Sequence, residues 1–189
     1  MAEPDELLVT LSDVVVRLED LGIDYMVTGS MAMSTYATAR TTMDIDVIAE
    51  IRGYDAARIE RRFAGDYYVD AILIENAQAR TSMFNVLNMN TGVKVDFIVR
   101  KPTVFEAEKF SRRRRSTFEG IEFWIIGKED LVLSKLCWAK DSHSELQFRD
   151  VRNLIESGVD DSFIESEIMR QDLHSVWEAF LEWKTRIEK

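Results

Sequence analysis

Two aspartates, Asp44 and Asp46, flank a single isoleucine in the stretch MDIDVIAEI. Side chains alternate across a β-strand, so both carboxylates lie on one face of this predicted strand, and Ile45 and Val47 lie on the other. Two ionised carboxylates one pleat apart repel each other, and a divalent cation removes that conflict. Mg²⁺ prefers carboxylate oxygens and completes its shell with waters and substrate phosphates. The pair therefore predicts a Mg²⁺ site, with Mn²⁺ as the alternative ion, whereas a solvated sheet face is the competing interpretation.

A third acid, Asp96, stands among strand-forming apolar residues in VKVDFIV. Alternation places Lys94 and Ile98 on the same face as Asp96 and apolar side chains on the other. If this strand and the strand of Asp44 are neighbours in the sheet, three carboxylates converge. The metal site is then expected to draw on both strands.

Gly29 and Ser30 precede the acid pair, at the point where the predicted strand DYMVTG ends and a helix begins. Free backbone N–H groups and the helix dipole at such a junction favour an anion. Glycine permits a close approach to the backbone, and Ser30 offers an N-cap and a hydroxyl donor. These two residues predict a phosphate-binding turn beside the acid pair.

The spacing of these motifs resembles the signature of the nucleotidyltransferase (polymerase-β-like) superfamily. That signature is a glycine followed by Gly or Ser, about a dozen residues, and then an acid pair; here VTGS is followed by a thirteen-residue gap and DID. Asp96 on a later strand fits the third acid of that family. The later stretches EDLVLSK and RDVRNLIE are similar to a region of AbiEii-type toxins and related nucleotidyltransferases.

The resemblance implies a nucleotidyltransferase fold and the transfer of a nucleoside monophosphate from an NTP, with release of pyrophosphate. It implies that Asp44 and Asp46 hold Mg²⁺ and that Gly29 and Ser30 contact the β- and γ-phosphates. Asp96 would either complete a second metal position or act as base toward the acceptor hydroxyl. Two metal ions together would stabilise the attacking and leaving oxygens of an in-line displacement.

Lys135, Asp150 and Arg40 are further candidates for nucleotide binding. Lys135 lies on a predicted helix among apolar neighbours, where an ammonium needs an anion; a triphosphate would supply one, and extension along the surface to water is the alternative. Asp150 would orient Lys135 or contact the nucleotide, with a structural salt bridge as the competing role. Arg40 precedes the acid strand and could reach a phosphate, although a loop arginine is exposed by default.

The elements that position these residues alternate between helix and strand. The apolar patterns predict helices over 4–22, 30–38, 55–65, 70–80 and 103–111, and strands over 24–29, 43–51, 82–90, 93–100 and 115–127. Residues 67–74 also fit a strand, and turns are expected at Thr91-Gly92 and Gly120. From Glu129 onward the pattern is helical throughout. The expected fold is α+β, a mixed β-sheet flanked by helices over 1–127, followed by a helical region over 128–189 packed on that core.

Composition limits the partners of the chain. The 189 residues carry a net charge of −10, which disfavours a generic grip on duplex DNA. The exception is the run Arg112–Arg115, which could steer RNA or another anionic acceptor, with a solvated turn between helix and strand as the alternative. A single cysteine, Cys137, excludes an internal disulfide, and no apolar stretch has the length of a membrane span. A cytoplasmic location is expected.

The first functional hypothesis is a Mg²⁺-dependent nucleotidyltransferase whose partners are an NTP and an acceptor such as tRNA or protein. A role in a toxin–antitoxin pair, with an antitoxin or other protein partner, is part of this hypothesis. The alternative is a catalytically silent module of the same fold that engages a protein partner. A phosphohydrolase using the acid cluster is a third hypothesis, although the sequence lacks the histidines that often accompany such sites.

Overall fold

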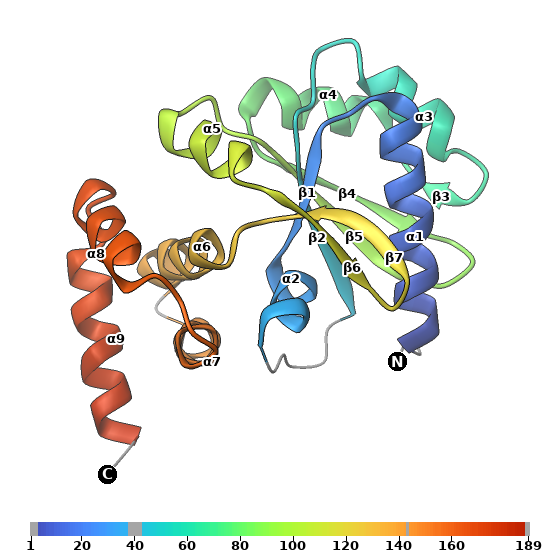
Figure 1. Cartoon of the computed structure of the whole chain (residues 1–189). Helices are drawn as coiled ribbons and strands as arrows, with labels where there is room; N and C mark the ends of the chain where they lie inside the picture. The colour runs from blue at the N-terminus through green and yellow to red at the C-terminus, as the bar shows by residue number, and fades with distance from the viewer. Residues whose placement is uncertain (1–3, 38–42, 143, 188–189) are drawn as a thin grey trace. The chain divides into compact units, whose positions relative to one another are not determined.

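The computed structural model describes residues 4–37, 43–142 and 144–187, which form two units (Figure 1). The first unit draws on residues 1–32 and 40–126, and the second on residues 33–39 and 127–189. None of the described helices combines the length and apolar character that crossing a membrane requires.

The first unit is built on a seven-stranded mixed sheet with the strand order β3-β4-β5-β2-β1-β7-β6. Its strands are β1 (Tyr25–Thr28), β2 (Asp44–Ala49), β3 (Tyr67–Tyr68), β4 (Met83–Asn88), β5 (Lys94–Val99), β6 (Arg114–Phe118) and β7 (Ile121–Ile125). Helices α1 (Pro4–Leu21), α3 (Ala56–Phe63), α4 (Ala71–Arg80) and α5 (Val104–Ser111) belong to the same unit, and α2 (Gly29–Tyr36) begins in it. The predicted α+β class with a mixed sheet and flanking helices is confirmed.

The two central strands that carry the acids are neighbours. β2 runs parallel to β5 and antiparallel to β1. One face of these strands is fully buried, with Ile45 and Phe97 at 0% exposure. Phe63 of α3 meets the Phe97 ring edge-on at a centroid distance of 6.0 Å, and Figure 1 shows α1, α3 and α4 on this side of the sheet. The strands that carry the three acids are therefore neighbours, as convergence of the acids requires.

Arg17 ties α1 to the end of α3 and the turn after it. Its guanidinium donates to Asp13, to Asp66 and to the carbonyl of Arg62, and it lies 5.4 Å from the centroid of the Phe63 ring. Arg17 is 6% exposed, so these bonds satisfy a charge that has little access to water. The arginine thereby holds α1 against the end of α3 and the turn that follows it.

Residues 67–74, which fit both a strand and a helix in the sequence, form a short strand and then the start of a helix. β3 covers only Tyr67 and Tyr68, and α4 begins at Ala71. Asp70 is the N-cap of α4: its carboxylate accepts from the backbone N–H groups of Ile72 and Leu73 at 2.7 and 3.4 Å. This cap stops the strand pattern from continuing into 71–74.

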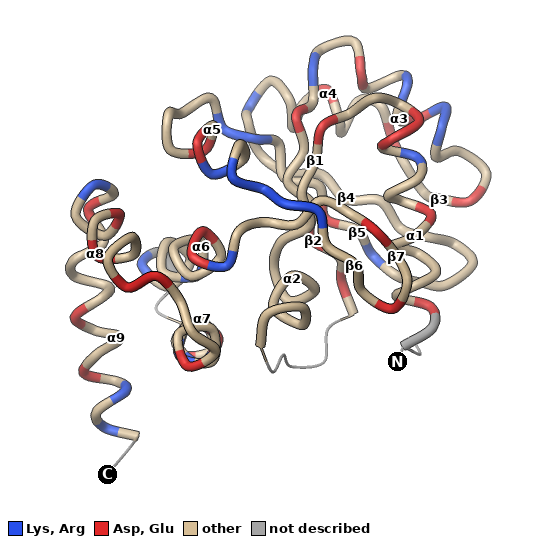
Figure 2. Tube along the Cα trace, in the orientation of Figure 1, with Lys and Arg blue, Asp and Glu red and all other residues tan. Residues whose placement is uncertain are grey.

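The basic run Arg112–Arg115 begins in the connection between α5 and β6, where a turn was expected, but its last two residues belong to the edge strand β6. Figure 2 shows the run as a continuous basic segment leading from α5 into β6. Arg113 donates to Asp24 and Arg115 to Glu19, each at 2.8 Å, and Arg112 lies 3.9 Å from Glu108. These ion pairs reduce the net positive charge that the run presents to an anionic partner.

The second unit contains α6 (Lys128–Ser142), α7 (Glu145–Glu156), α8 (Asp161–Arg170) and α9 (His174–Ile187). An aromatic cluster joins α7 to α9: the Phe148 ring lies 5.8 Å from the centroids of both Phe180 and Trp183. All three are less than 9% exposed, so they form the core between these helices.

The cap of α8 predicts an acid-sensitive element. The pKa of Asp160 lies below its usual value because the Ser162 hydroxyl and the Phe163 backbone N–H donate to its carboxylate. A lowered pKa contributes stability at neutral pH that is lost as the pH falls through about 4 and below. The stability gap between wild type and Asp160→Ala in urea unfolding is therefore expected to shrink from pH 7 to pH 3. The exposed Glu165→Ala on the same helix serves as control, and a gap that persists at pH 3 would contradict the role of the ionised cap.

Candidate active site

The structure brings the three predicted acids to one face of the sheet. Asp46 is the register partner of Asp96 across β2 and β5, and Asp44 precedes Asp46 by one pleat. They alternate with the buried apolar residues that face the helices, so their carboxylates lie on the opposite face. The Asp96 side chain is 10% exposed and that of Asp44 is 48% exposed. Solvent exposure therefore differs between the acids: Asp96 on β5 is buried, and Asp44 on β2 is accessible.

Gly29, at the start of α2, lies directly against Asp46 of β2. Its φ is +62°, and a Cβ at this position would lie 1.9 Å from Oδ2 of Asp46. Only glycine leaves room there, because its backbone adopts positive φ without strain and carries no side chain. The Asp46 carboxylate thus lies at the N-terminus of an eight-residue helix, where the helix dipole favours negative charge.

Ser30 lies inside the first turn of α2 and not at its N-cap, because the helix begins at Gly29. The N-cap expectation for Ser30 is wrong for this reason. Ser30 is 5% exposed, so its side chain is held within the fold beside the junction. The phosphate-binding role of Gly29 and Ser30 stays a prediction.

Lys94 extends its ammonium between two of the acids. Its Nζ donates to Oδ2 of Asp96 at 2.8 Å and lies 3.5 Å from Oδ2 of Asp44. The pKa of Lys94 is raised above its ordinary value because it donates to Asp96 and lies beside the charge of Asp44. Alternation placed Lys94 on this face, but sequence reasoning did not assign it to the site. Its signal was a basic residue two positions before the third acid on one strand.

The donor set of the acids fits a metal ion only in part. Within residues 4–37, 43–142 and 144–187, no group of three or more Asp, Glu, His or Cys side chains is arranged to hold one. Asp96 nevertheless has one buried oxygen, Oδ1, without a hydrogen-bond partner among the described residues. An unpartnered buried carboxylate oxygen is costly and marks a place for a donor or a cation. Asp44 and Asp46 supply the hard oxygen ligands that Mg²⁺ prefers, so the chemistry of these two acids suits the ion.

The face of the sheet that carries the acids continues onto β4, where it includes a polar residue, Asn85, that the sequence analysis did not assign to the site. Asn85 is the register partner of Asp96 in the antiparallel β4–β5 pair, and Leu87 is the partner of Lys94. Asn85 and Leu87 are exposed, while the intervening Val86 is fully buried. The sequence signal was a polar residue at the outward position of an apolar strand. Beyond Asp96, the face that carries the acids therefore presents an exposed amide and an exposed apolar side chain.

Lys135 and Asp150, in the second unit, are joined by a buried ion pair. The Lys135 ammonium donates to Oδ2 of Asp150 at 2.6 Å, and the two side chains are 8% and 4% exposed. The carboxylate on α7 supplies the anion that a buried lysine on α6 requires. The contact agrees with the proposed orienting or structural role of Asp150. Nucleotide binding by either residue stays a prediction, and Arg40 lies outside the described residues.

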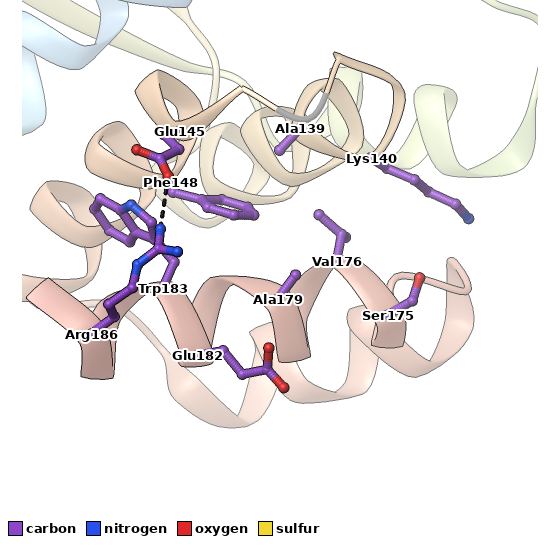
Figure 3. Close-up of a pocket in the computed structure, with 10 residues that line it drawn as sticks. All are labelled: Ala139, Lys140, Glu145, Phe148, Ser175, Val176, Ala179, Glu182, Trp183 and Arg186. Carbon is purple, nitrogen blue, oxygen red and sulfur yellow. Dashed lines mark hydrogen bonds and ion pairs between the residues drawn. The ribbon is translucent and has the colours of Figure 1, made fainter.

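A cavity lies within the helical unit, and none of the predicted site residues lines it (Figure 3). Its volume is about 500 Å³, and its lining consists of Ala139, Lys140, Glu145, Phe148, Ser175, Val176, Ala179, Glu182, Trp183 and Arg186. Arg186 donates to Glu145 at 2.7 Å beside Trp183. The cavity therefore has an aromatic wall and a charged rim.

No protein-family model matches the sequence, and no curated protein is detectably similar to it. Solved structures do share its fold. An antigenic nucleotidyltransferase-like protein of Paracoccidioides brasiliensis superposes with a TM-score of 0.59 and 15% identity, covering 99% of this chain and 92% of that one. Lincomycin-bound LnuA, a lincosamide antibiotic adenylyltransferase, gives a TM-score of 0.51 and 14% identity, covering 81% and 96% of the two chains.

A third similar structure is ANT(2″)-Ia in complex with adenylyl-2″-tobramycin, with a TM-score of 0.51 and 10% identity over 96% of this chain and 99% of that one. All these identities are low, so the similarity concerns the arrangement of the backbone. The similarity to AbiEii-type toxins stays a prediction. The sequence motif, the order of the strands and these superpositions agree that the chain has the nucleotidyltransferase fold.

Proposed function

We propose that this protein is a Mg²⁺-dependent nucleotidyltransferase that transfers a nucleoside monophosphate from an NTP to a hydroxyl-bearing acceptor. The observation that carries the proposal is the position of Asp46. Its carboxylate lies against the start of α2 at Gly29 and is the register partner of Asp96 on the neighbouring strand. The acid that would bind the metal and the helix terminus that would bind phosphate are adjacent in the first unit. The shared fold supports the same chemistry.

In this function Asp44 and Asp46 hold Mg²⁺, and Gly29 and Ser30 bind the β- and γ-phosphates through backbone N–H groups and the serine hydroxyl. The ion, when bound, offsets negative charge on the triphosphate and on the leaving pyrophosphate. The acceptor oxygen forms a bond to the α-phosphorus as the bond from that phosphorus to the oxygen bridging to the β-phosphate breaks. Asp96, through its unpartnered Oδ1, is the group that receives the acceptor proton.

The acceptor class follows from the charge of the surface and from the structural neighbours. Arg112, Arg113 and Arg115 of the basic run lie in ion pairs with acids of the same chain, which weakens the case for RNA as acceptor. Two proteins of the same fold are named for antibiotic substrates or adducts. A small hydroxyl-bearing molecule or a protein side chain is therefore the favoured acceptor. A toxin–antitoxin role, with an antitoxin as partner, is compatible with the protein acceptor.

Calorimetric titration of each of the four NTPs into the folded full chain, in Mg²⁺ and in EDTA, tests the function. One NTP is expected to bind at least tenfold more tightly in Mg²⁺, and the Asp44→Asn/Asp46→Asn variant is expected to lose this difference. Asp20→Asn, an exposed acid on α1, is the matched control and should bind as wild type does. If folded wild type binds no NTP in Mg²⁺, the enzyme hypothesis is wrong and a silent binding module becomes the better account.

A further inference from the structure

The Lys94 ammonium lies between two of the carboxylates that a second metal ion would use as ligands. Lys94 is the register partner of Asp44 and stands two residues before Asp96 on the same strand face. Its Nζ is 2.8 Å from Oδ2 of Asp96 and 3.5 Å from Oδ2 of Asp44. These are the first and third acids of the site. A cation is therefore already present between them, supplied by the chain.

The ammonium opposes the binding of a second divalent ion beside Asp96. The Lys94 ammonium lies within ion-pair distance of two of the three carboxylates. A second divalent ion at Asp96 would place a like charge beside the ammonium at short range. A second ion that bound Oδ2 of Asp96 would have to displace Lys94 from that oxygen. The repulsion between like charges and the competition for Oδ2 both favour a single ion.

The two oxygens of Asp96 have different surroundings. Oδ2 accepts from Lys94, while Oδ1 is buried and has no hydrogen-bond partner among the described residues. A carboxylate held through one oxygen has a defined orientation, and its other oxygen stays available to a donor. An acceptor hydroxyl is such a donor. A fixed lysine can therefore aim Asp96 as a second metal ion would.

We infer that Lys94 replaces a second divalent ion: Asp44 and Asp46 hold one ion with the NTP, and the Lys94 ammonium positions Asp96 toward the acceptor hydroxyl. The inference rests on the proposed function and differs from the two-ion site expected from the sequence. Lys94 is a positioning residue in this arrangement, since it acts on the acceptor through Asp96. The exposed fraction of its side chain, 40%, leaves its place accessible to a solvated ion once the lysine is removed.

The number of bound Mn²⁺ ions tests the inference, measured by the EPR signal of free Mn²⁺ in the presence of one equivalent of the α,β-methylene analogue of the bound NTP. Wild type is expected to bind one ion per chain, and Lys94→Met and Lys94→Gln two. Lys94→Arg keeps a cation and should bind one. Lys101→Met, an exposed lysine two residues beyond β5, is the matched control and should bind one.

Thermal unfolding gives a second readout. In EDTA, Lys94→Met is expected to unfold at a lower temperature than wild type, because the acids lose their internal cation, and Mn²⁺ should raise its midpoint more than that of wild type. Two ions in wild type, or one ion in wild type and also in Lys94→Met and Lys94→Gln, would overturn the inference and leave the proposed function standing. No Mn²⁺-dependent binding of the analogue by wild type would overturn both.

Discussion

Gly29→Ala is expected to abolish Mg²⁺-dependent NTP binding while leaving the chain folded. The new Cβ would lie 1.9 Å from Oδ2 and 2.7 Å from Cγ of Asp46. Rotation of the Asp46 side chain moves these two atoms away from the start of α2, and the remaining contact, 3.0 Å to Cβ of Asp46, requires a small backbone shift. The site then loses an acid at the metal position and the space beside the helix terminus. Affinity for the NTP in Mg²⁺ should fall at least 100-fold, about 2.7 kcal/mol, measured by calorimetry.

Gly22→Ala is the matched control for this change. Gly22 has almost the same backbone conformation, with φ +64° against +62° at Gly29, but nothing lies within 4 Å of the position that a Cβ would take there. Each alanine should cost about 1 kcal/mol of stability for its left-handed backbone. Only Gly29→Ala should lose NTP binding. Equal loss of binding in both variants would show that backbone strain, and not the contact with Asp46, controls the site.

The local features of the active site could be predicted from the sequence because strand alternation is a property of neighbouring residues. It placed Asp44 and Asp46 on one face and Asp96 with Lys94 on another strand's outward face. The glycine and the turn to a helix were also local signals. What the alternation left open was the order of the strands, because pairing of β2 with β5 depends on how the chain between them folds.

Contacts across elements could not be predicted in the same way. The distance of 3.5 Å from Lys94 to Asp44 exists only because the parallel register sets these two residues side by side. Asn85 joins the row through the antiparallel register of β4, which a strand pattern alone does not specify. The start of α2 at Gly29 was predicted one residue too late, because glycine at positive φ is as typical of a turn as of a helix start.

The pairing of Lys135 with Asp150 was open for the same reason, and it predicts a large loss of stability in Lys135→Met. The two side chains are 8% and 4% exposed, and the ammonium donates to the carboxylate at 2.6 Å. Removing the lysine takes away the ammonium that donates to this buried carboxylate. Breaking a buried pair on one side costs about 3–5 kcal/mol. Urea unfolding followed by tryptophan fluorescence should show a loss of this size.

Lys135→Met/Asp150→Leu separates a structural role from nucleotide binding. Replacing both charges by apolar side chains should recover most of the lost stability, because neither desolvated charge remains. Lys140→Met is the matched control: it lies on the same helix, but its partner Asp172 has a side chain that is 95% exposed, so the cost should stay below about 1 kcal/mol. If the pair is structural, the double variant binds the NTP as tightly as wild type does. A stable double variant with weakened NTP binding would instead assign Lys135 or Asp150 to the nucleotide, as the sequence pattern predicts.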